Sequence, residues 1–226
     1  MSSAVIIPAL NEEASIGRVV VAVREHVGRV VVVDNGSTDA TAKVARAAGA
    51  HVVHQQERGY GAACLRGIEE LAKDPPDVVV FVDGDFSDHP DDVVEVRAPV
   101  LRGDADLVIG SRVRGTRERG ALTPQQVFGN WLATTLIRLR WNVAFTDLGP
   151  LRAVRWTTLM QMQMTDRNYG WTVEMQIKAA RDGVRCLEVP VRYRRRIGKS
   201  KVSGTVKGTI MAGVIILRTI AQHALR

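Results

Sequence analysis

Short runs of Val and Ile alternate with helix-like segments through the first 112 residues of the chain. These runs are continuously apolar, which is typical of strands buried on both faces, as in parallel sheets. The alternation therefore predicts an α/β fold in which helices flank a doubly wound, mostly parallel sheet. The expected strands are Ala4–Ile7, Arg29–Val33, His51–His54, Val78–Val82 and Asp106–Ile109, followed in the second half by Arg185–Val191.

Helix signals fill most of the remaining chain. Thr123 and Pro124 place a capping hydroxyl before a proline at the first helical position, a common helix start. The basic segment Arg112–Gly120 carries no such pattern and is expected to be a mobile loop. No linker or repeat divides the chain, so one domain over residues 1–226 is expected. The expected helices are Glu13–His26, Asp39–Ala48, Gly61–Ala72, Pro90–Leu101, Thr123–Arg140, Tyr169–Asp182 and Thr205–Ala224.

The net charge of +7 is divided unevenly along the chain. Residues 1–100 carry 9 Lys and Arg against 16 Asp and Glu, a net of −7, whereas residues 101–226 carry 22 against 8, a net of +14. This split favours an acidic, cation-binding half beside a basic, anion-binding half. A nucleic-acid partner is not expected, because such proteins do not leave half of the chain acidic, and only Tyr193 interleaves with the basic run.

Targeting and redox signals are weak. Two cysteines, Cys64 and Cys186, are too few for a disulfide framework or a thiolate metal site. The N-terminal stretch MSSAVIIPALNEE lacks the basic region of a signal peptide. The apolar run Ile210–Leu217 is bounded by Lys207 and Arg218, and a bilayer span needs ~20 apolar residues. We therefore expect a cytoplasmic protein, either free or peripheral on the cytoplasmic membrane face.

Acidic residues follow the expected strands. Open α/β sheets bind ligands at the carboxyl ends of their strands, and Asp83-Gly84-Asp85 comes directly after a buried strand. Two carboxylates one residue apart repel each other unless a cation bridges them, and Mg²⁺ takes one or two carboxylates plus substrate phosphates. An ordinary Asp-Gly turn explains the same residues equally well. Asp34 has a similar alternative, an Asx turn before the next helix. No glycine-rich dinucleotide motif follows the first strand.

Taken together, these motifs resemble glycosyltransferase family 2, the inverting enzymes of the GT-A fold. The stretches in the first half are VIIPALNEEASI, VVVDNGSTDAT, RGYGAACLRGIE and VVVFVDGDFSDHPDD. The second half, with DLVIGSR, FTDLGPLRAVRW, YGWTVEMQIKAARDG and VPVRYRRRIGKSKVSG, is most similar to the polyprenyl-phosphate sugar transferases of the dolichol-phosphate mannose or glucose synthase type. The resemblance implies a Rossmann-like GT-A sheet in a single domain with a C-terminal amphipathic helix. Residues 1–112 would bind the nucleotide sugar and residues 113–226 the acceptor.

The resemblance also implies roles for individual residues. Asp83 and Asp85 match the family's DxD, which binds Mg²⁺ or Mn²⁺ on the donor diphosphate, and Asp85 is also a catalytic candidate. Arg112 matches an arginine expected to face the phosphates during catalysis, and Asp147 a recurrent aspartate that would position acceptor or metal. The implied nucleotide-sugar residues are Pro8, Ala9, Glu12, Asp34, Arg58 and Gly84 with the two aspartates. The implied phosphate or acceptor clamp is Arg195, Ser200 and Lys201 with Arg112; a solvated basic strand edge is the plainer alternative.

One departure from the wider family bears on the acceptor. Members that glycosylate sugar hydroxyls carry a Glu-Asp pair after a glycine, and its Asp is the general base. Here Gly170 is followed by Trp171 and Thr172, with Asp147 and Glu174 as the remaining substitutes. A hydroxyl needs a base, whereas a phosphate monoester is already ionised. The missing carboxylate therefore favours a phosphate acceptor, which the resemblance implies to be a polyprenyl phosphate.

Two helices bear on where such an acceptor would be met. The expected helices at 123–140 and 205–224 combine aromatic and aliphatic residues with flanking Arg and Lys, as interfacial helices do. Packing on the sheet or a homodimer interface explains them equally well.

We therefore expect a metal-dependent inverting hexosyltransferase that uses UDP-glucose or GDP-mannose type donors and a polyprenyl phosphate. The same donor chemistry with a soluble small-molecule acceptor is the alternative. A non-catalytic sugar-nucleotide-binding module is a third interpretation, against which the intact Asp-Gly-Asp argues.

Overall fold

The computed structural model of the protein describes residues 1–198 and 206–224. Its strands are β1 (Ser3–Ala9), β2 (Arg29–Asp34), β3 (His51–His54), β4 (Val78–Phe81), β5 (Leu107–Arg117), β6 (Arg152–Arg155) and β7 (Cys186–Tyr193). Its helices are α1 (Ile16–Arg24), α2 (Thr41–Ala47), α3 (Tyr60–Leu71), α4 (Asp92–Arg102), α5 (Pro124–Trp141), α6 (Trp156–Met162), α7 (Trp171–Arg181) and α8 (Val206–Ala224).

Within the described residues the strands form one sheet in the order β3-β2-β1-β4-β6-β5-β7. β1 pairs in parallel with β2 and β4, and β5 pairs in parallel with β7. β6 lies antiparallel between β4 and β5. The predicted α/β fold with a mostly parallel sheet is therefore confirmed. The sequence prediction had no strand at β6 and no helix at α6, because Arg152 and Arg155 at the ends of a four-residue strand hide its apolar pattern.

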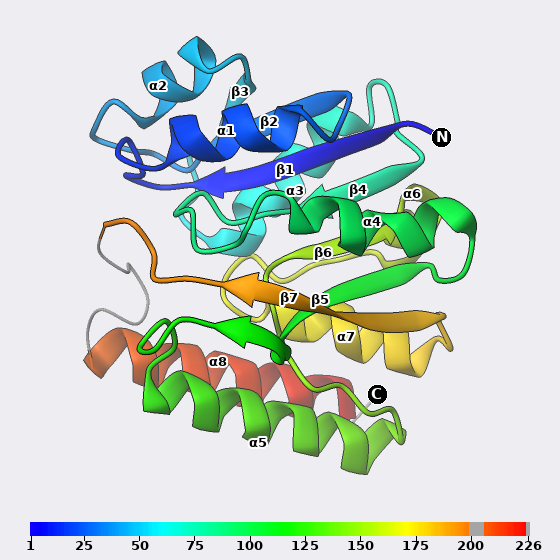
Figure 1. Ribbon diagram of the computed structural model, residues 1–226. Coiled ribbons are helices and arrows are strands. Elements are labelled where there is room, and N and C mark those ends of the chain that lie inside the picture. Colours follow the sequence, from blue (N-terminus) through cyan, green and yellow to red (C-terminus); the bar gives the residue numbers. More distant parts are fainter. Residues whose placement is uncertain (199–205, 225–226) are drawn as a thin grey trace.

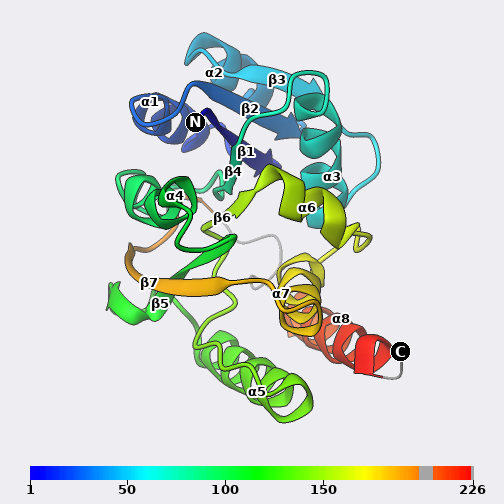
Figure 2. The ribbon, with the colours of Figure 1, turned by 90° about the vertical axis from the view of Figure 1, so that its right-hand side faces the viewer.

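Helices cover both faces of the sheet (Figure 1). α1, α2 and α4 lie on one face and α3, α6 and α7 on the other, as the view along the sheet shows (Figure 2). Successive residues of β1 alternate between the two cores, Ile6 in one and Ile7 in the other, and both are fully buried. This two-sided burial is the physical reason why the strands read as unbroken apolar runs.

α5 and α8 pack against each other and against α7, at the bottom of the molecule in Figure 1. Thr123 and Gln126 form the predicted cap at the start of α5: the Thr123 hydroxyl accepts from the Gln126 backbone N–H, and Pro124 begins the helix. No helix in residues 1–198 and 206–224 is long and apolar enough to cross a membrane.

The predicted mobile loop at Arg112–Gly120 is wrong over most of its length. β5 continues to Arg117, and after an irregularity beyond Ser111 it pairs again with β7, Thr116 opposite Arg192 and Arg117 opposite Tyr193. The extension depends on a close approach of two backbones, because a Cβ at Gly115 would overlap the backbone of Val191. Partners 76 residues further along the chain satisfy the backbone of this polar segment, so its composition alone did not indicate a strand.

Candidate active site

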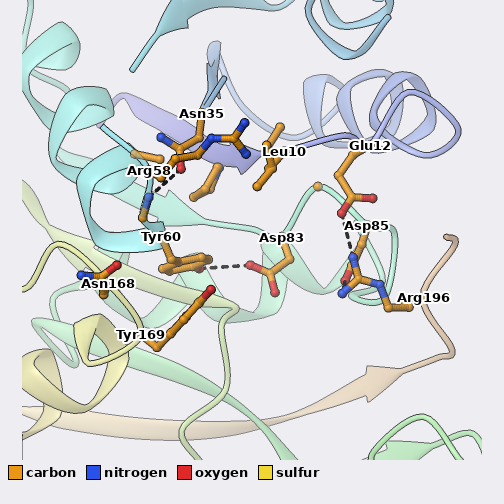
Figure 3. A pocket seen from close by; sticks show the side chains of 15 residues that line it. Leu10, Glu12, Asn35, Arg58, Tyr60, Asp83, Asp85, Asn168, Tyr169 and Arg196 are labelled. Carbon is orange, nitrogen blue, oxygen red and sulfur yellow. Dashed lines mark hydrogen bonds and ion pairs between the residues drawn. The ribbon is translucent and has the colours of Figure 1, made fainter. Parts of the chain in front are cut away.

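A cavity of about 390 Å³ opens at the carboxyl ends of β1, β2 and β4 (Figure 3). The parallel register sets Ala9 of β1 beside Asp34 of β2, and Ile6 of β1 beside Phe81 of β4, so the loops after these strands meet at one edge. Of the predicted nucleotide-sugar residues, those that line the cavity are Pro8, Ala9, Glu12, Arg58, Asp83, Gly84 and Asp85.

Asp83 and Asp85 lie on the loop after β4 and bring two neighbouring carboxyl groups to the cavity. Burial, and next the negative charge of Asp85, raise the pKa of Asp83 to about 7. The Tyr60 hydroxyl donates a hydrogen bond of 3.0 Å to Asp83 Oδ1. Asp85 Oδ1 accepts from the backbone N–H of Ser87 at 2.9 Å. Two neighbouring carboxylates are thus held in a setting that favours a cation.

Arg196 brings a positive charge to these carboxylates from the segment after β7. Its Nη2 donates to Glu12 Oε1 at 2.7 Å, and its Nη1 lies 3.2 Å from Asp85 Oδ2. Figure 3 shows Glu12, Asp85 and Arg196 grouped on one side of the cavity, with Asn35 and Arg58 on another. Residues almost 200 positions apart in the chain therefore share one charge cluster.

The carboxylates fit a hard divalent cation that also needs ligands from a bound substrate. The described residues contain no group of three His, Cys, Asp or Glu side chains arranged to hold a metal by themselves. Mg²⁺ needs only one or two protein carboxylates when phosphates and waters complete its shell. A third carboxyl group, Asp88, is 2% exposed, and its Oδ1 has no hydrogen-bond partner among the described residues. Burial, followed by the charges of Asp83 and Asp85, raises the pKa of Asp88. A cation bound with a diphosphate would offset the repulsion among these buried carboxylates and favour their ionised forms.

Asn35, and not Asp34, lines the cavity at the end of β2. The Asp34 carboxylate accepts from the Ser37 backbone N–H at 3.0 Å and lies 3.1 Å from His54 Nδ1, so it holds the turn and the neighbouring strand. Asn35 Nδ2 donates to Glu57 O at 2.6 Å, and its Oδ1 accepts from Gly59 N at 2.8 Å. Asn35 thereby shapes the loop that presents Arg58.

Arg112 and Asp147 form a buried pair outside the set of cavity-lining residues. Arg112 donates from Nε to Asp147 Oδ2 at 2.8 Å and from Nη2 to Oδ1 at 2.7 Å, and its backbone N–H adds a third bond of 2.7 Å. The guanidinium lies over the Tyr193 ring, 5.0 Å from its centroid. Burial opposes the charged form of Arg112, but the bonds to Asp147 outweigh it and raise the pKa. The pair is a rigid unit, with its carboxylate fully committed to the arginine.

The predicted clamp is only partly described. Arg195 donates from Nε and Nη2 to the carbonyl of Arg119 at 2.9 and 2.7 Å and does not line the cavity. Ser200 and Lys201 lie outside the described residues.

The loop before α7 supplies two cavity residues that sequence reasoning missed, Asn168 and Tyr169. Glu174 organises this loop: its carboxylate accepts from the backbone N–H groups of Thr165 and Asp166 and pairs with Lys178 Nζ at 2.7 Å. Burial alone would raise the pKa of Glu174, but these bonds lower it. With 1% exposure, Glu174 serves as an anchor for the loop.

Gly61 lets α3 approach this loop closely. A Cβ at Gly61 would overlap the backbone carbonyl of Asp166, so we expect Gly61→Ala to lower the free energy of unfolding by about 1–3 kcal/mol. The same change at Gly129 of α5 meets nothing within 4 Å and should be neutral or stabilising by up to about 1 kcal/mol. Urea unfolding followed by circular dichroism measures both. Equal effects of the two substitutions would contradict this account of the loop.

The sequence and fold of the chain were compared with those of known proteins. A family model described as glycosyl transferase family 2 matches residues 4–160. An uncharacterized glycosyltransferase of Mycobacterium tuberculosis is 37% identical over 92% of this chain and 93% of its own length. A dolichyl-phosphate hexose transferase of Haloferax volcanii is 32% identical over 99% of this chain and 96% of its own.

Solved structures agree on the fold. Glucosyl-3-phosphoglycerate synthase from Mycobacterium tuberculosis, in complex with Mn²⁺, uridine diphosphate and phosphoglyceric acid, superposes with a TM-score of 0.78 at 23% identity. The match covers 99% of this chain and 78% of that one. Because the family model covers well over half of the chain and both relatives exceed 30% identity over nearly its whole length, the chain belongs to glycosyltransferase family 2.

Proposed function

We propose that the protein is a metal-dependent, inverting hexosyltransferase that moves a hexose from a UDP- or GDP-sugar to a polyprenyl phosphate. The observation that carries this proposal is the meeting of Asp83, Asp85 and two arginines in one cavity at the carboxyl edge of a family 2 sheet. The solved neighbour with Mn²⁺ and uridine diphosphate supports the donor class. A single domain, with donor binding in residues 1–112 and acceptor binding in residues 113–226, accommodates both substrates.

Within this proposal the donor nucleotide lies between the loops after β1 and β2. Pro8, Ala9 and Arg58 form the walls nearest Asn35, where the base and ribose fit, and Asp34 holds the turn that places Asn35. Asp83 and Asp85 hold Mg²⁺ or Mn²⁺ with the diphosphate. When bound, the metal would stabilise the negative charge that develops on the leaving diphosphate. Gly84 keeps the loop between the two carboxylates narrow, with Pro8 O only 3.3 Å from where its Cβ would lie.

Two buried carboxylates bear on the type of acceptor, because each is paired with a cationic side chain and so is not available as a general base. Asp147 is fully buried against Arg112, and Glu174 is buried against Lys178, so neither is placed to remove a proton from an acceptor hydroxyl. A phosphate oxygen needs no such base: it attacks C1 of the sugar, the bond from C1 to the diphosphate oxygen breaks, and the nucleoside diphosphate leaves. We propose that Arg112, oriented by Asp147, faces the phosphates during this step.

An apolar surface on α5 and α8 supports a lipid acceptor. A second cavity of about 550 Å³ between these helices is lined mainly by apolar residues, among them Phe128, Leu132 and Ile216. Phe128 and Trp131 are 60% and 58% exposed, with ring centroids 5.8 Å apart. Exposed aromatic residues on a helix that ends in exposed arginines, Arg138 and Arg140, are typical of a membrane interface. The dolichyl-phosphate relative supports the same acceptor class.

A soluble phosphate-bearing acceptor is the second candidate. It is favoured by the solved neighbour, whose structure holds phosphoglyceric acid, a small soluble phosphate. Both candidates share the donor site, and neither needs Asp147 or Glu174 as a base. They differ in whether the α5 and α8 surface is used. In the second case that surface would be free to pair two copies of the chain.

A thermal-shift panel tests the donor part of the proposal. With Mn²⁺ present, a cognate nucleotide at about 100 times its Kd should stabilise the protein by about 2.7 kcal/mol and raise Tm by roughly 5–10 °C. The panel compares UDP, GDP, UDP-glucose and GDP-mannose with ATP as the control. EDTA should remove most of the shift. No shift with any uridine or guanosine diphosphate, or a shift indifferent to EDTA, would contradict the proposed site.

A further inference from the structure

We propose that the Arg196 guanidinium, which is paired with Glu12 and Asp85, blocks the Asp85 oxygen that a divalent cation on Asp83 and Asp85 needs, and that it leaves Asp85 only when metal and nucleotide diphosphate bind together. The inference rests on the proposed function, because it concerns the same metal site. It adds a property that the family assignment does not supply: metal alone binds poorly, and binding of metal and nucleotide is coupled through one side chain.

The position of Arg196 supports this role. Asp85 reaches the cluster from the loop after β4 and Glu12 from the loop after β1, while Arg196 enters from the segment after β7. Its two terminal nitrogens are divided between the carboxylates, one at 2.7 Å from Glu12 and the other at 3.2 Å from Asp85. Its Nε is buried without a hydrogen-bond partner in the described part of the chain. In the described part of the chain, the guanidinium is therefore held through its two terminal nitrogens by the Glu12 and Asp85 carboxylates.

The backbone keeps the arginine close even when its head group moves. The N–H of Ile197 donates to the carbonyl of Asp85 at 2.9 Å, which ties the segment to the metal loop. Arg196 lines the cavity and its side chain is 29% exposed, so it is accessible to a ligand there. A rotation of the side chain can thus transfer the guanidinium from the carboxylates to a ligand in the cavity without unseating the backbone.

Charge decides when that transfer occurs. A divalent cation on Asp85 Oδ2 would lie within a few ångströms of the guanidinium, and like charges at that separation repel strongly in a half-buried site. Metal alone must therefore displace Arg196 with no new partner for it. A nucleotide diphosphate offers oxygens that match the planar guanidinium fork. With both ligands present, the metal would bind the Asp83 and Asp85 carboxylates and the arginine would bind the diphosphate.

The consequence is a thermodynamic coupling. If Arg196 opposes metal in the empty site and binds the diphosphate in the filled one, each ligand raises the affinity for the other by the same factor. Removing the guanidinium should have effects of opposite sign: tighter binding of metal alone and weaker binding of the nucleotide. A residue that only helped the protein fold would not produce this pair of changes.

Mn²⁺ binding followed by electron paramagnetic resonance of the free ion provides the test, with the full chain and with UDP and GDP as separate probes. Arg196→Met removes the charge without adding a metal ligand. We expect it to bind Mn²⁺ alone about tenfold more tightly than the wild type, and the gain in Mn²⁺ affinity on adding nucleotide to shrink about tenfold. Arg196→Lys keeps the charge and should stay within about threefold of the wild type for Mn²⁺ alone. Arg102→Met is the control, because Arg102 pairs with Asp104 at the surface and does not line the cavity; it should stay within about twofold.

Two outcomes would overturn the inference: Mn²⁺ affinity in Arg196→Met equal to or weaker than in the wild type, or the same gain in Arg102→Met. Circular dichroism melting of each variant checks that a weaker result does not come from unfolding. Asp85→Asn separates this inference from the proposed function. If that variant binds Mn²⁺ and nucleotide as the wild type does, the metal site itself is wrong. If it loses Mn²⁺ while Arg196→Met matches the wild type, only the role of Arg196 is wrong.

Discussion

Replacing Asp85 with Asn is expected to lower the rate of hexosyl transfer by about 10²–10³-fold while leaving the fold intact. The amide keeps an oxygen that can accept from Ser87 N, as Asp85 Oδ1 does at 2.9 Å, so the loop should hold its shape. The loss of charge removes half of the carboxylate pair that would hold the metal against the leaving diphosphate. The rate is measured with a radiolabelled donor and Mn²⁺, and the fold by circular dichroism.

Asp74→Asn provides a control with the same chemical change. Asp74 has a side chain 88% exposed and pairs with Arg29 on the surface, away from the cavity. Its substitution should leave the rate within about twofold of the wild type. Full activity of Asp85→Asn, or full activity of the wild type in EDTA, would show that the reaction does not depend on this carboxylate pair.

The second large effect concerns stability. Asp147→Asn is expected to lower the free energy of unfolding by about 3 kcal/mol, because it leaves the guanidinium of Arg112 buried without a counter-charge. The Asp147 side chain is 1% exposed and that of Arg112 12%, so water cannot take over the interaction. Urea unfolding followed by circular dichroism measures the change.

A double variant tests the cause of that destabilisation. Arg112→Met with Asp147→Leu removes both charges, so it should be more stable than Asp147→Asn alone. Asp104→Asn is the matched control: Asp104 pairs with Arg102 at the surface, and its loss should cost about 0.5 kcal/mol at most. A loss under about 1 kcal/mol in Asp147→Asn would mean that the pair contributes little to the fold.

Much of the fold could be predicted because its strands are buried on both faces. Val78–Phe81 is a run of four apolar residues, all of them buried. A strand that is covered by helices on both faces needs apolar side chains on both, so its sequence is a continuous apolar run. The extension of β5 to Arg117 could not be predicted in this way, since its backbone partners lie on β7 and its side chains are polar. The antiparallel strand β6 is short and has an arginine at each end, which conceals it.

The site was predictable where its residues lie at strand ends. Asp83, Asp85 and Glu12 were expected at the cavity and lie there, because parallel strands bring their carboxyl ends to one edge. It was harder to predict which of two adjacent residues in the sequence faces the cavity. Asn35 lines the cavity where Asp34 was expected, and Arg196 reaches it where Arg195 does not. A one-residue step reverses the direction of a side chain in extended backbone, and nothing in a run of three arginines indicates which one points inward.

Residues brought in by distant segments could not be found from spacing. Tyr169 lines the same cavity as Asp83 (Figure 3) although 86 positions separate them in the chain. The loop that carries Tyr169 is held by the buried Glu174, whose role as an anchor is visible only from its hydrogen bonds.

One transfer assay tests the central claim most directly. The protein is incubated with Mn²⁺, radiolabelled UDP-glucose or GDP-mannose, and either a short polyprenyl phosphate or 3-phosphoglycerate, and the products are separated by organic extraction. We predict that label enters the organic phase only with polyprenyl phosphate and Mn²⁺, and that Asp85→Asn lowers the rate of its appearance there by about 10²–10³-fold. Label that stays entirely in water-soluble product, or no transfer to either acceptor while the nucleotide binds, would contradict the account.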